Sequence, residues 1–341
     1  MSNKTSISSV VSRSAALLAE QGWASVDHCL ADDWAGALAS ECQLLEEAGM
    51  LRPHCFEFQA TAGERCEYRH PGRSFVDLDG AEAVEDLALA PNLSSFAREA
   101  AVPLAEALVE QLPWLALAGS MGDVSQVQVK LQLTKGPAGS APCHYDTSET
   151  APRRQITWLL YLSTDWKPEF GAELVIQPFL GSRAAVTPCF NHGVLFLSDR
   201  ILHYSLPPSR EGQAHQRWLL TVWLDGELVN APRGEAWPPL LQRLLAPAVY
   251  SKECSMPDGP ALRALRAAQE EEIRSLQEDE EFAEMLPDLR EAARQTPTDL
   301  GMCEAERPRE LKRKRMEVDN KTGPYGEQGL ETDEAPPPLS N

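Results

Sequence analysis

The sequence predicts a mainly β fold with flanking helices, in which the strands pair as a sandwich or a barrel. Short apolar or alternating runs recur through the middle of the chain, at residues 124–133, 156–162, 172–179, 193–197 and 217–224. Turn residues separate these runs, and no helical pattern alternates with them. A parallel sheet would need a crossover helix between successive strands, so the pattern favours antiparallel pairing.

The first twenty residues are Ser-rich, with Lys4 and Arg13 as basic residues and no acidic residue before Glu20. This composition is compatible with an organelle transit peptide. The alternative, which we favour, is a short helix in SSVVSRSAALLAEQG that stops at Gly22 and leads into the first strand.

Two further helical segments follow this stretch. Asp32 begins an amphipathic helix whose apolar side chains share one face. These side chains are Trp34, Leu38, Cys42, Leu44 and Leu45. Residues 93–111 carry apolar side chains at four-residue spacing, and Pro103 within them predicts a kink or a break into two helices.

The strands begin with residues 56–80, which predict short strands and turns, with a turn at His70-Pro71-Gly72. VSQVQVKLQL (124–133) alternates polar and apolar residues and predicts a strand. TKGPAGSAPC then forms the loop before His144, and ITWLLYL (156–162) predicts a buried strand.

A candidate metal site begins at His144 and Asp146. Residues two apart in an extended strand project to the same face, so an imidazole and a carboxylate can point at one ion. His203 follows the buried run GVLFLSDR and is the best third ligand, while His192 and His215 are rivals by position. Two histidines and one carboxylate form the ligand set of non-haem Fe(II) oxygenases. The alternative for His-x-Asp alone is a surface turn.

The strand RWLLTVW (217–223) adds a candidate anion site. Alternation places Arg217, Leu219, Thr221 and Trp223 on one face. A guanidinium on the inward face of an apolar strand needs an anionic partner, and its fork suits a carboxylate. The alternative partner is a carboxylate of the protein itself. Beside an iron site, we expect the carboxylate of an organic acid.

Several motifs carry a resemblance to a known family. They are His144-x-Asp146, TWLLYLSTDW with Tyr161 and Trp166, GAELVI with Leu174, LFLSDR before His203, and RWLLTVW, with GWASVDHCL upstream. With these motifs, residues from about 21 to 226 resemble the prolyl 4-hydroxylase type of Fe(II)/2-oxoglutarate-dependent dioxygenase. The pattern is most similar to that of the hypoxia-type prolyl hydroxylases.

The resemblance implies a fold and a set of site residues. The implied fold is a double-stranded β-helix (jelly roll). The implied metal ligands are His144, Asp146 and His203. The implied 2-oxoglutarate-binding residues are Arg217, Tyr161 and Thr221, and we expect Trp223 and Leu174 in the substrate pocket. The interval from His203 to Arg217 is longer than is usual in the family, and we interpret PPSREGQAH as an enlarged hairpin.

The resemblance also implies the chemistry. Fe(2+) and L-ascorbate are the expected cofactors, and 2-oxoglutarate and O2 the expected co-substrates, with a peptidyl proline as the hydroxylated group. The alternatives are an oxygenase that acts on a small molecule or a nucleobase, and an inactive jelly-roll binding module. A second arginine, six residues after the anchor in nucleic-acid demethylases, is replaced here by Trp223.

The amino-acid composition restricts the classes of partner that we expect the protein to bind. The net charge of −20 argues against binding to a phosphate backbone, so we expect a protein or peptide partner and no nucleic acid. No apolar run approaches the ~20 residues of a membrane span, so no membrane is expected. Eight scattered cysteines without a C-x-x-C pair predict reduced thiols in an intracellular, cytoplasmic protein.

The expected domain organisation has four parts. Residues 1–20 form the N-terminal helix or leader, and 21–226 the dioxygenase domain. Residues 227–295 are a helical C-terminal extension with a dense acidic face, and 296–341 a disordered tail. Within the tail, LKRKR (311–315) is a candidate nuclear import signal, and its alternative is an ordinary charge run.

Overall fold

The computed structural model describes residues 3–59, 65–78, 87–136, 141–147, 151, 153–178 and 183–229, with residues 263, 267, 271, 274 and 278. All of these belong to one unit, Met1–Leu300, whereas no residue of the second unit, Gly301–Asn341, is described. The predicted tail with LKRKR and nearly all of the predicted helical extension therefore lie outside the described residues.

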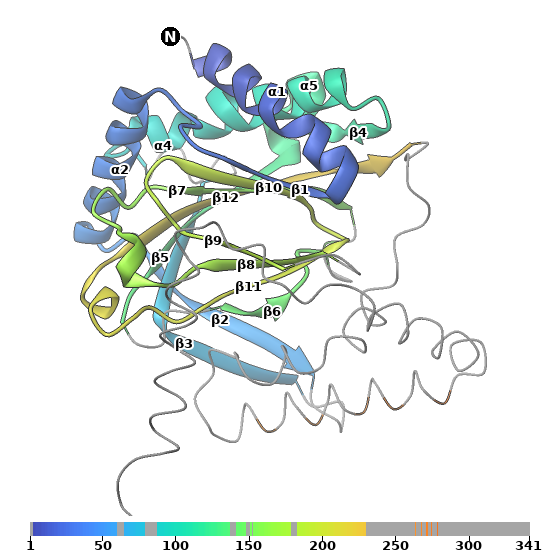
Figure 1. Ribbon diagram of the computed structural model, residues 1–341. Coiled ribbons are helices and arrows are strands. Elements are labelled where there is room, and N and C mark those ends of the chain that lie inside the picture. Colours follow the sequence, from blue (N-terminus) through green and yellow to red (C-terminus); the bar gives the residue numbers. More distant parts are fainter. Residues whose placement is uncertain are drawn as a thin grey trace, which may run out of the picture. The chain divides into compact units, whose positions relative to one another are not determined.

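Two sheets form the centre of the described chain (Figure 1). The larger sheet has the order β1-β10-β7-β12-β5-β3-β2, with β4 paired to the end of β12. Its strands are β1 (Trp23–Val26), β2 (Arg52–Gln59), β3 (Arg65–Asp77), β4 (Leu115–Leu117), β5 (Val127–Thr134), β7 (Arg154–Tyr161), β10 (His192–Leu197) and β12 (Arg217–Leu228).

The smaller sheet has the order β6-β11-β8-β9. Its strands are β6 (Ala141–His144), β8 (Leu174–Pro178), β9 (Ala184–Val186) and β11 (Ile201–Ser205). The described strand pairs in both sheets are antiparallel, which confirms the predicted mainly β class.

Alternation along the strands separates two cores. On β12, Leu220 and Val222 belong to the large core on the helix side of the sheet. Leu159 of β7 and Ile176 of β8 belong instead to a second core between the two sheets. The space between the sheets is therefore lined by one face of each, and the site described below lies there.

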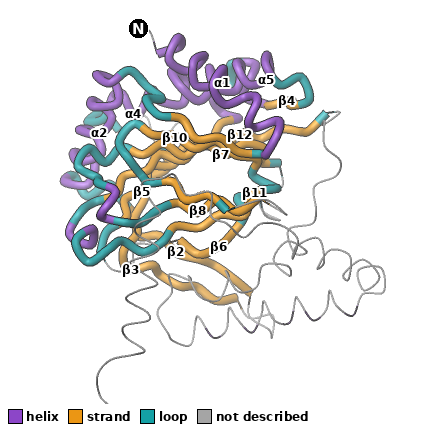
Figure 2. The backbone as a smooth tube through the Cα atoms, in the orientation of Figure 1, coloured by secondary structure: helices purple, strands orange, loops and turns teal. Residues whose placement is uncertain are grey.

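Helices cover the outer face of the larger sheet (Figures 1 and 2). They are α1 (Asn3–Gln21), α2 (Asp32–Glu47), α4 (Pro91–Phe96) and α5 (Val102–Gln111). On α2, Trp34, Leu38, Cys42 and Leu45 are buried as predicted. The prediction for Leu44 is wrong, because its side chain is 46% exposed. Within the described residues, no helix is long and apolar enough to span a membrane.

The helical stretch around Pro103 is interrupted, as predicted. A π-helical turn, η1 (Ala97–Ala101), separates α4 from α5, and Pro103 follows in the first turn of α5. Proline has no N–H for the helical ladder, and its ring crowds the carbonyl four residues earlier. A wider turn immediately before it accommodates both effects. Short 3-10 turns connect other elements, namely η2 (Ala118–Met121), η3 (Val124–Gln126), η4 (Pro168–Phe170) and η5 (Gly212–Ala214).

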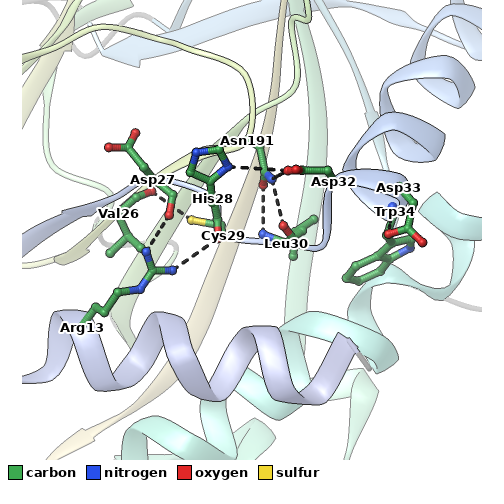
Figure 3. A network of polar contacts seen from close by, with 10 residues as sticks. All are labelled: Arg13, Val26, Asp27, His28, Cys29, Leu30, Asp32, Asp33, Trp34 and Asn191. Carbon is green, nitrogen blue, oxygen red and sulfur yellow. Dashed lines mark hydrogen bonds and ion pairs between the residues drawn. The ribbon is translucent and has the colours of Figure 1, made fainter. Parts of the chain in front are cut away.

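The junction between α1, β1 and α2 is pinned by polar contacts (Figure 3). Arg13 of α1 donates hydrogen bonds to the carbonyls of Asp27 (2.7 Å) and His28 (3.3 Å). Asn191, just before β10, accepts from the N–H of Leu30 and donates to its carbonyl, both at 2.9 Å. These contacts satisfy backbone groups of the loop and fix where α2 begins on the sheet.

Two local predictions are wrong. His70-Pro71-Gly72 lies inside β3, and the pairing with β2 shifts register there, so the chain forms an irregular strand in place of a turn. PPSREGQAH does not form a hairpin, because β11 and β12 belong to different sheets. The segment crosses between them, where Ser209 N–H donates to the Phe170 carbonyl at 2.7 Å. A Cβ on Gly212 would collide with the same carbonyl, so this close crossing requires glycine.

Candidate metal and co-substrate site

Three predicted ligands meet at the end of the smaller sheet. His144 ends β6, and its backbone pairs with that of His203 on β11. Asp146 follows two residues after His144. Its Oδ1 lies 3.4 Å from His144 Nε2 and 3.8 Å from His203 Nε2. One ligand atom from each residue lies within 4.8 Å of the others, so the triad is assembled without any movement of the backbone.

Asp146 is held in its ionised form. Thr157 on β7 donates its hydroxyl to Asp146 Oδ2 at 2.8 Å, and Ser198 lies 2.8 Å from the same hydroxyl. Burial alone would raise the pKa of Asp146, but the neighbouring His203 and His144 and the Thr157 hydroxyl hold it well below its usual range. The carboxylate therefore keeps its negative charge and leaves Oδ1 directed at the two imidazoles.

His203 is held in its neutral form. Burial and the adjacent His144 lower the pKa of His203 to about 4, although Asp146 and the Ile201 carbonyl act in the opposite direction. Its Nδ1 lies 3.3 Å from the Ile201 carbonyl oxygen, which can only accept a hydrogen bond. Nδ1 therefore carries the proton, and the Nε2 lone pair faces Asp146. Phe196 packs against the ring at 4.6 Å between centroids.

The donor set fits a divalent metal ion. Ligand bonds of about 2.0–2.2 Å place neighbouring donor atoms roughly 3 Å apart. The Asp146 Oδ1 to imidazole distances of 3.4 Å and 3.8 Å are longer, so the donor atoms would move closer together around an ion. Two imidazoles and one carboxylate leave further coordination positions open on Fe(II). His144, with a side chain 40% exposed, forms the open side of this cluster.

The two rival histidines have other partners. His192 Nε2 lies 2.5 Å from Ser25 Oγ and its Nδ1 lies 3.0 Å from Asp27 Oδ1. His215 Nδ1 lies 2.8 Å from Asp165, and its ring stacks on Phe170. Neither belongs to the cluster around Asp146, so the structure brings together the ligands chosen from the sequence.

Arg217 lies between the two sheets, as the alternation of RWLLTVW predicts. It is 5% exposed and donates to the Ala172 carbonyl at 2.8 Å and to Ser205 Oγ of β11 at 3.4 Å. Burial lowers its pKa, while Tyr161 and the carboxylate of Glu173 favour its charged form. The long crossing segment has therefore not turned Arg217 away from the site, and Glu173 is the protein carboxylate that acts on it.

The two predicted helpers of Arg217 lie on the same inner face. Burial raises the pKa of Tyr161 to about 12, with Arg217 opposing this shift, so the phenol remains a hydrogen-bond donor at neutral pH. Thr221, four residues after Arg217 on β12, accepts a hydrogen bond from Gln132 Nε2 at 3.3 Å. The surface around Arg217 thus offers a cation and hydroxyl groups to an anionic ligand.

The predicted substrate-pocket residues are also on this face. Leu174 of β8 packs in the core between the sheets with Leu159. Trp223 is buried, and the Arg154 guanidinium lies 4.1 Å from its ring centroid. An apolar wall and an aromatic ring therefore lie in the same inter-sheet space as the triad.

Comparisons with known proteins fit this geometry. The family model of the 2OG-Fe(II) oxygenase superfamily matches residues 129–225, which include the triad and Arg217. A solved structure of a prolyl 4-hydroxylase from Phytophthora capsici is similar over 86% of this chain and 96% of its own, with 26% identity and a TM-score of 0.67. Residues 129–225 therefore carry a 2OG-Fe(II) oxygenase domain. The chain is a 2-oxoglutarate-dependent dioxygenase with the predicted double-stranded β-helix, and its resemblance to the prolyl 4-hydroxylase type is confirmed.

Other solved structures are more distant from this oxygenase. A prolyl 4-hydroxylase from Pseudomonas putida has 25% identity and a TM-score of 0.48, covering 64% of this chain and 99% of its own. A prolyl hydroxylase from Trichoplax adhaerens, in complex with a peptide fragment of hypoxia inducible factor, has 17% identity and a TM-score of 0.48. The similarity covers 65% of this chain and 91% of its own. None of the curated proteins matches the chain in sequence. The 2OG-Fe(II) oxygenase domain implies Fe(II), 2-oxoglutarate and O2.

Two residues near the candidate site, Arg73 and Gln132, were not predicted from the sequence. Arg73 of β3 pairs with Thr134 of β5 and donates to Gln132 Oε1, and Gln132 in turn donates to Thr221 Oγ1. Burial and the charge of Arg217 lower the pKa of Arg73 to about 10, while Asp146 raises it. The alternation of VQVKLQLT already showed that polar side chains share one face of β5. In the structure that polar face of β5 lines the site. The alternation alone did not indicate this position.

Proposed function

We propose that this dioxygenase hydroxylates a peptidyl proline in a protein substrate. One observation carries the proposal: the buried Arg217 reaches Ser205, two residues after the triad's His203 on β11, in a chain whose similarity to a prolyl 4-hydroxylase extends over most of both chains. A substrate prolyl ring would lie against Trp223, whose flat indole is on the inner face of β12. The reaction class follows from the family, and the proline substrate is our proposal.

Each residue of the triad region has a defined task. His144, Asp146 and His203 would hold Fe(II), with Thr157 keeping the carboxylate in place through its 2.8 Å hydrogen bond. Iron with 2-oxoglutarate and O2 would supply the oxidation, in which the co-substrate yields succinate and CO2 and one oxygen atom enters a C–H bond. The protein orients these groups and keeps water away.

The co-substrate would lie between the triad and Arg217. The guanidinium would bind the distal carboxylate of 2-oxoglutarate, and the hydroxyls of Tyr161 and Thr221 would complete the contacts. Leu159 and Leu174 would exclude water from this space. L-ascorbate, expected from the same resemblance, would keep the iron reduced.

A small-molecule or nucleobase substrate is the competing function. The net charge of −20 and Trp223 at the position of the demethylases' second arginine both disfavour a nucleobase. Peptide and small-molecule substrates are distinguished by incubating the protein with Fe(II), 2-oxoglutarate, O2 and a proline-containing peptide library. The products are then analysed by mass spectrometry. We expect peptides that gain one oxygen atom at proline. Hydroxylation of free amino acids or other small molecules, with no peptide modified, would refute the proline proposal.

A further inference from the structure

Five side chains form an alternating row of cations and aromatic rings across the larger sheet, which we call the cation–aromatic row. Arg52 lies 5.0 Å and Lys130 lies 4.7 Å from the ring centroid of Phe75. Lys130 also lies 5.2 Å from the centroid of Trp223, and Arg154 lies 4.1 Å from it. The row thus runs over five adjacent strands, β2, β3, β5, β12 and β7.

The strand register places this row on the inner face of the sheet. Lys130 pairs across the strands with Thr221, two residues before Trp223 on β12. Residues two apart project to the same side, and Arg217 at the start of that face reaches Ser205 of the opposite sheet. The row therefore shares its surface with the co-substrate residues and is no part of the helix-covered face.

One end of the row touches the metal-ligand loop. Arg154 donates from Nη1 to the backbone carbonyl of Asp146 at 3.2 Å and from Nη2 to Gln128 Oε1 at 2.6 Å. Trp223, under the same guanidinium, is consequently next to the triad. A group bound on Trp223 and Lys130 would lie beside the iron ligands.

The charge of the row is opposite to that of the chain. Three cations lie along it, and the Asp77 carboxylate lies 2.7 Å from Arg52 and 3.8 Å from Lys130. The whole chain carries −20. Lys130 keeps a side chain 21% exposed and Arg52 one 65% exposed, so both remain accessible to a ligand. Rings beneath the cations fix their positions, since a cation–π contact restrains the charged group over the ring face.

We propose that the cation–aromatic row binds the acidic side chains of an extended substrate peptide whose target residue lies on Trp223. This inference rests on the proposed peptide substrate and specifies its chemistry. Extended chain advances about 3.3 Å per residue, so an Asp or Glu about two residues from the target would reach Lys130. Arg52, further along the row, would bind a second carboxylate. The target of this enzyme is thus a proline within an acidic sequence.

Peptide binding tests the inference separately from turnover. The full chain, loaded with Fe(II) and 2-oxoglutarate without O2, is titrated with three fluorescent peptides that share one proline and differ only in flanking Glu, Gln or Lys. We expect the Glu peptide to bind about 10-fold more tightly than the Gln peptide, and the difference to shrink at high salt. Lys130→Glu should reverse the preference in favour of the Lys peptide.

Lys135→Glu is the matched control, because it makes the same charge change on a lysine that is 54% exposed and paired with Glu46. It should leave the preference for the Glu peptide intact, and unchanged 2-oxoglutarate affinity shows that each variant is folded. Equal binding of the three peptides, or equal effects of the two substitutions, would overturn the inference. If O2 then leads to hydroxylation of all three alike, only the acidic preference fails. If no peptide is bound or hydroxylated, the proposed function fails with it.

Discussion

At the scale of single residues, the site is a set of buried polar groups, each held in one charge state by its neighbours. Thr157 and the two imidazoles keep Asp146 ionised, and burial keeps His203 neutral. Metal ligands must be deprotonated, so these states prepare the triad for binding. Arg217 is likewise kept beside groups that favour its charge.

Replacing Asp146 tests the triad. Asp146→Ala removes the anionic ligand and leaves two imidazoles, so we expect both iron content and 2-oxoglutarate turnover to be lost. Iron is measured after anaerobic loading and removal of excess metal. His192→Ala and His215→Ala are the matched controls and should retain iron, because both side chains have partners away from the cluster. An iron-replete, active Asp146→Ala protein would disprove the assignment.

Arg217 is tested by co-substrate affinity. A hydrogen bond to a charged group contributes roughly 1.5–3 kcal/mol, which corresponds to about 10- to 150-fold in affinity. Arg217→Met should weaken 2-oxoglutarate by a factor in that range while iron still binds. Arg217→Lys should recover only part of the loss, since an ammonium lacks the bidentate fork. Titration with 2-oxoglutarate under anaerobic conditions measures this.

The control for that titration is Arg210→Met, the same substitution at an exposed position of the segment before β12. It should bind 2-oxoglutarate as the unaltered protein does. If Arg217→Met also binds with unchanged affinity, the anchor of the co-substrate is another residue. Arg73 is the first candidate, because the charges of both Arg217 and Asp146 act on its guanidinium.

At the scale of elements, the sequence predicted features that depend on neighbouring residues, but not features that depend on pairing between distant strands. The alternation of RWLLTVW depends on the two-residue period of a strand, so the direction of Arg217 followed from the sequence. Asp146 lies in a bend two residues beyond the end of β6, so the period of a strand did not by itself place its carboxylate. Arg73 was missed because its position depends on the pairing of β3 with β5, which is distant in sequence. The supposed hairpin was wrong for the same reason, since sheet membership is decided by tertiary packing.

The amphipathic face of α2 gives a paired test of stability. Leu38 is fully buried, whereas Leu44 on the same helix is 46% exposed. Leu38→Ala should lower the free energy of unfolding by about 2–5 kcal/mol, since it leaves a cavity in the core. Leu44→Ala should change it by about 0.5 kcal/mol or less. Denaturant unfolding measures both, and equal losses would contradict the described face of the helix.

At the scale of the whole molecule, α1 shares a core with the strands it precedes. Its apolar side chains Ile7, Val10, Val11 and Leu18 are buried in the same core as residues of β5 and β12. The boundary that we expected at residue 21 therefore separates two segments of one packed unit. Residues 3–21 form the helix that we favoured from the sequence.

Removal of residues 1–21 should consequently destabilise the oxygenase. Deleting α1 uncovers apolar side chains of α5 and β1, which it covers in the intact chain. We expect a lower melting temperature and a tendency to aggregate, measured by thermal unfolding and light scattering. A truncated chain with the melting temperature of the full one would show that α1 is dispensable, as expected of a leader.

Heavy-oxygen labelling tests the oxygenase chemistry of this site most directly. The protein is supplied with Fe(II), 2-oxoglutarate, a substrate peptide from the library and O2 labelled with heavy oxygen, and both products are weighed by mass spectrometry. A 2-oxoglutarate-dependent dioxygenase places one labelled atom in succinate and one in the hydroxylated peptide, and Asp146→Ala abolishes both. Succinate without label, or labelled products of equal yield from Asp146→Ala, would contradict the assignment of His144, Asp146 and His203 as the site of the reaction.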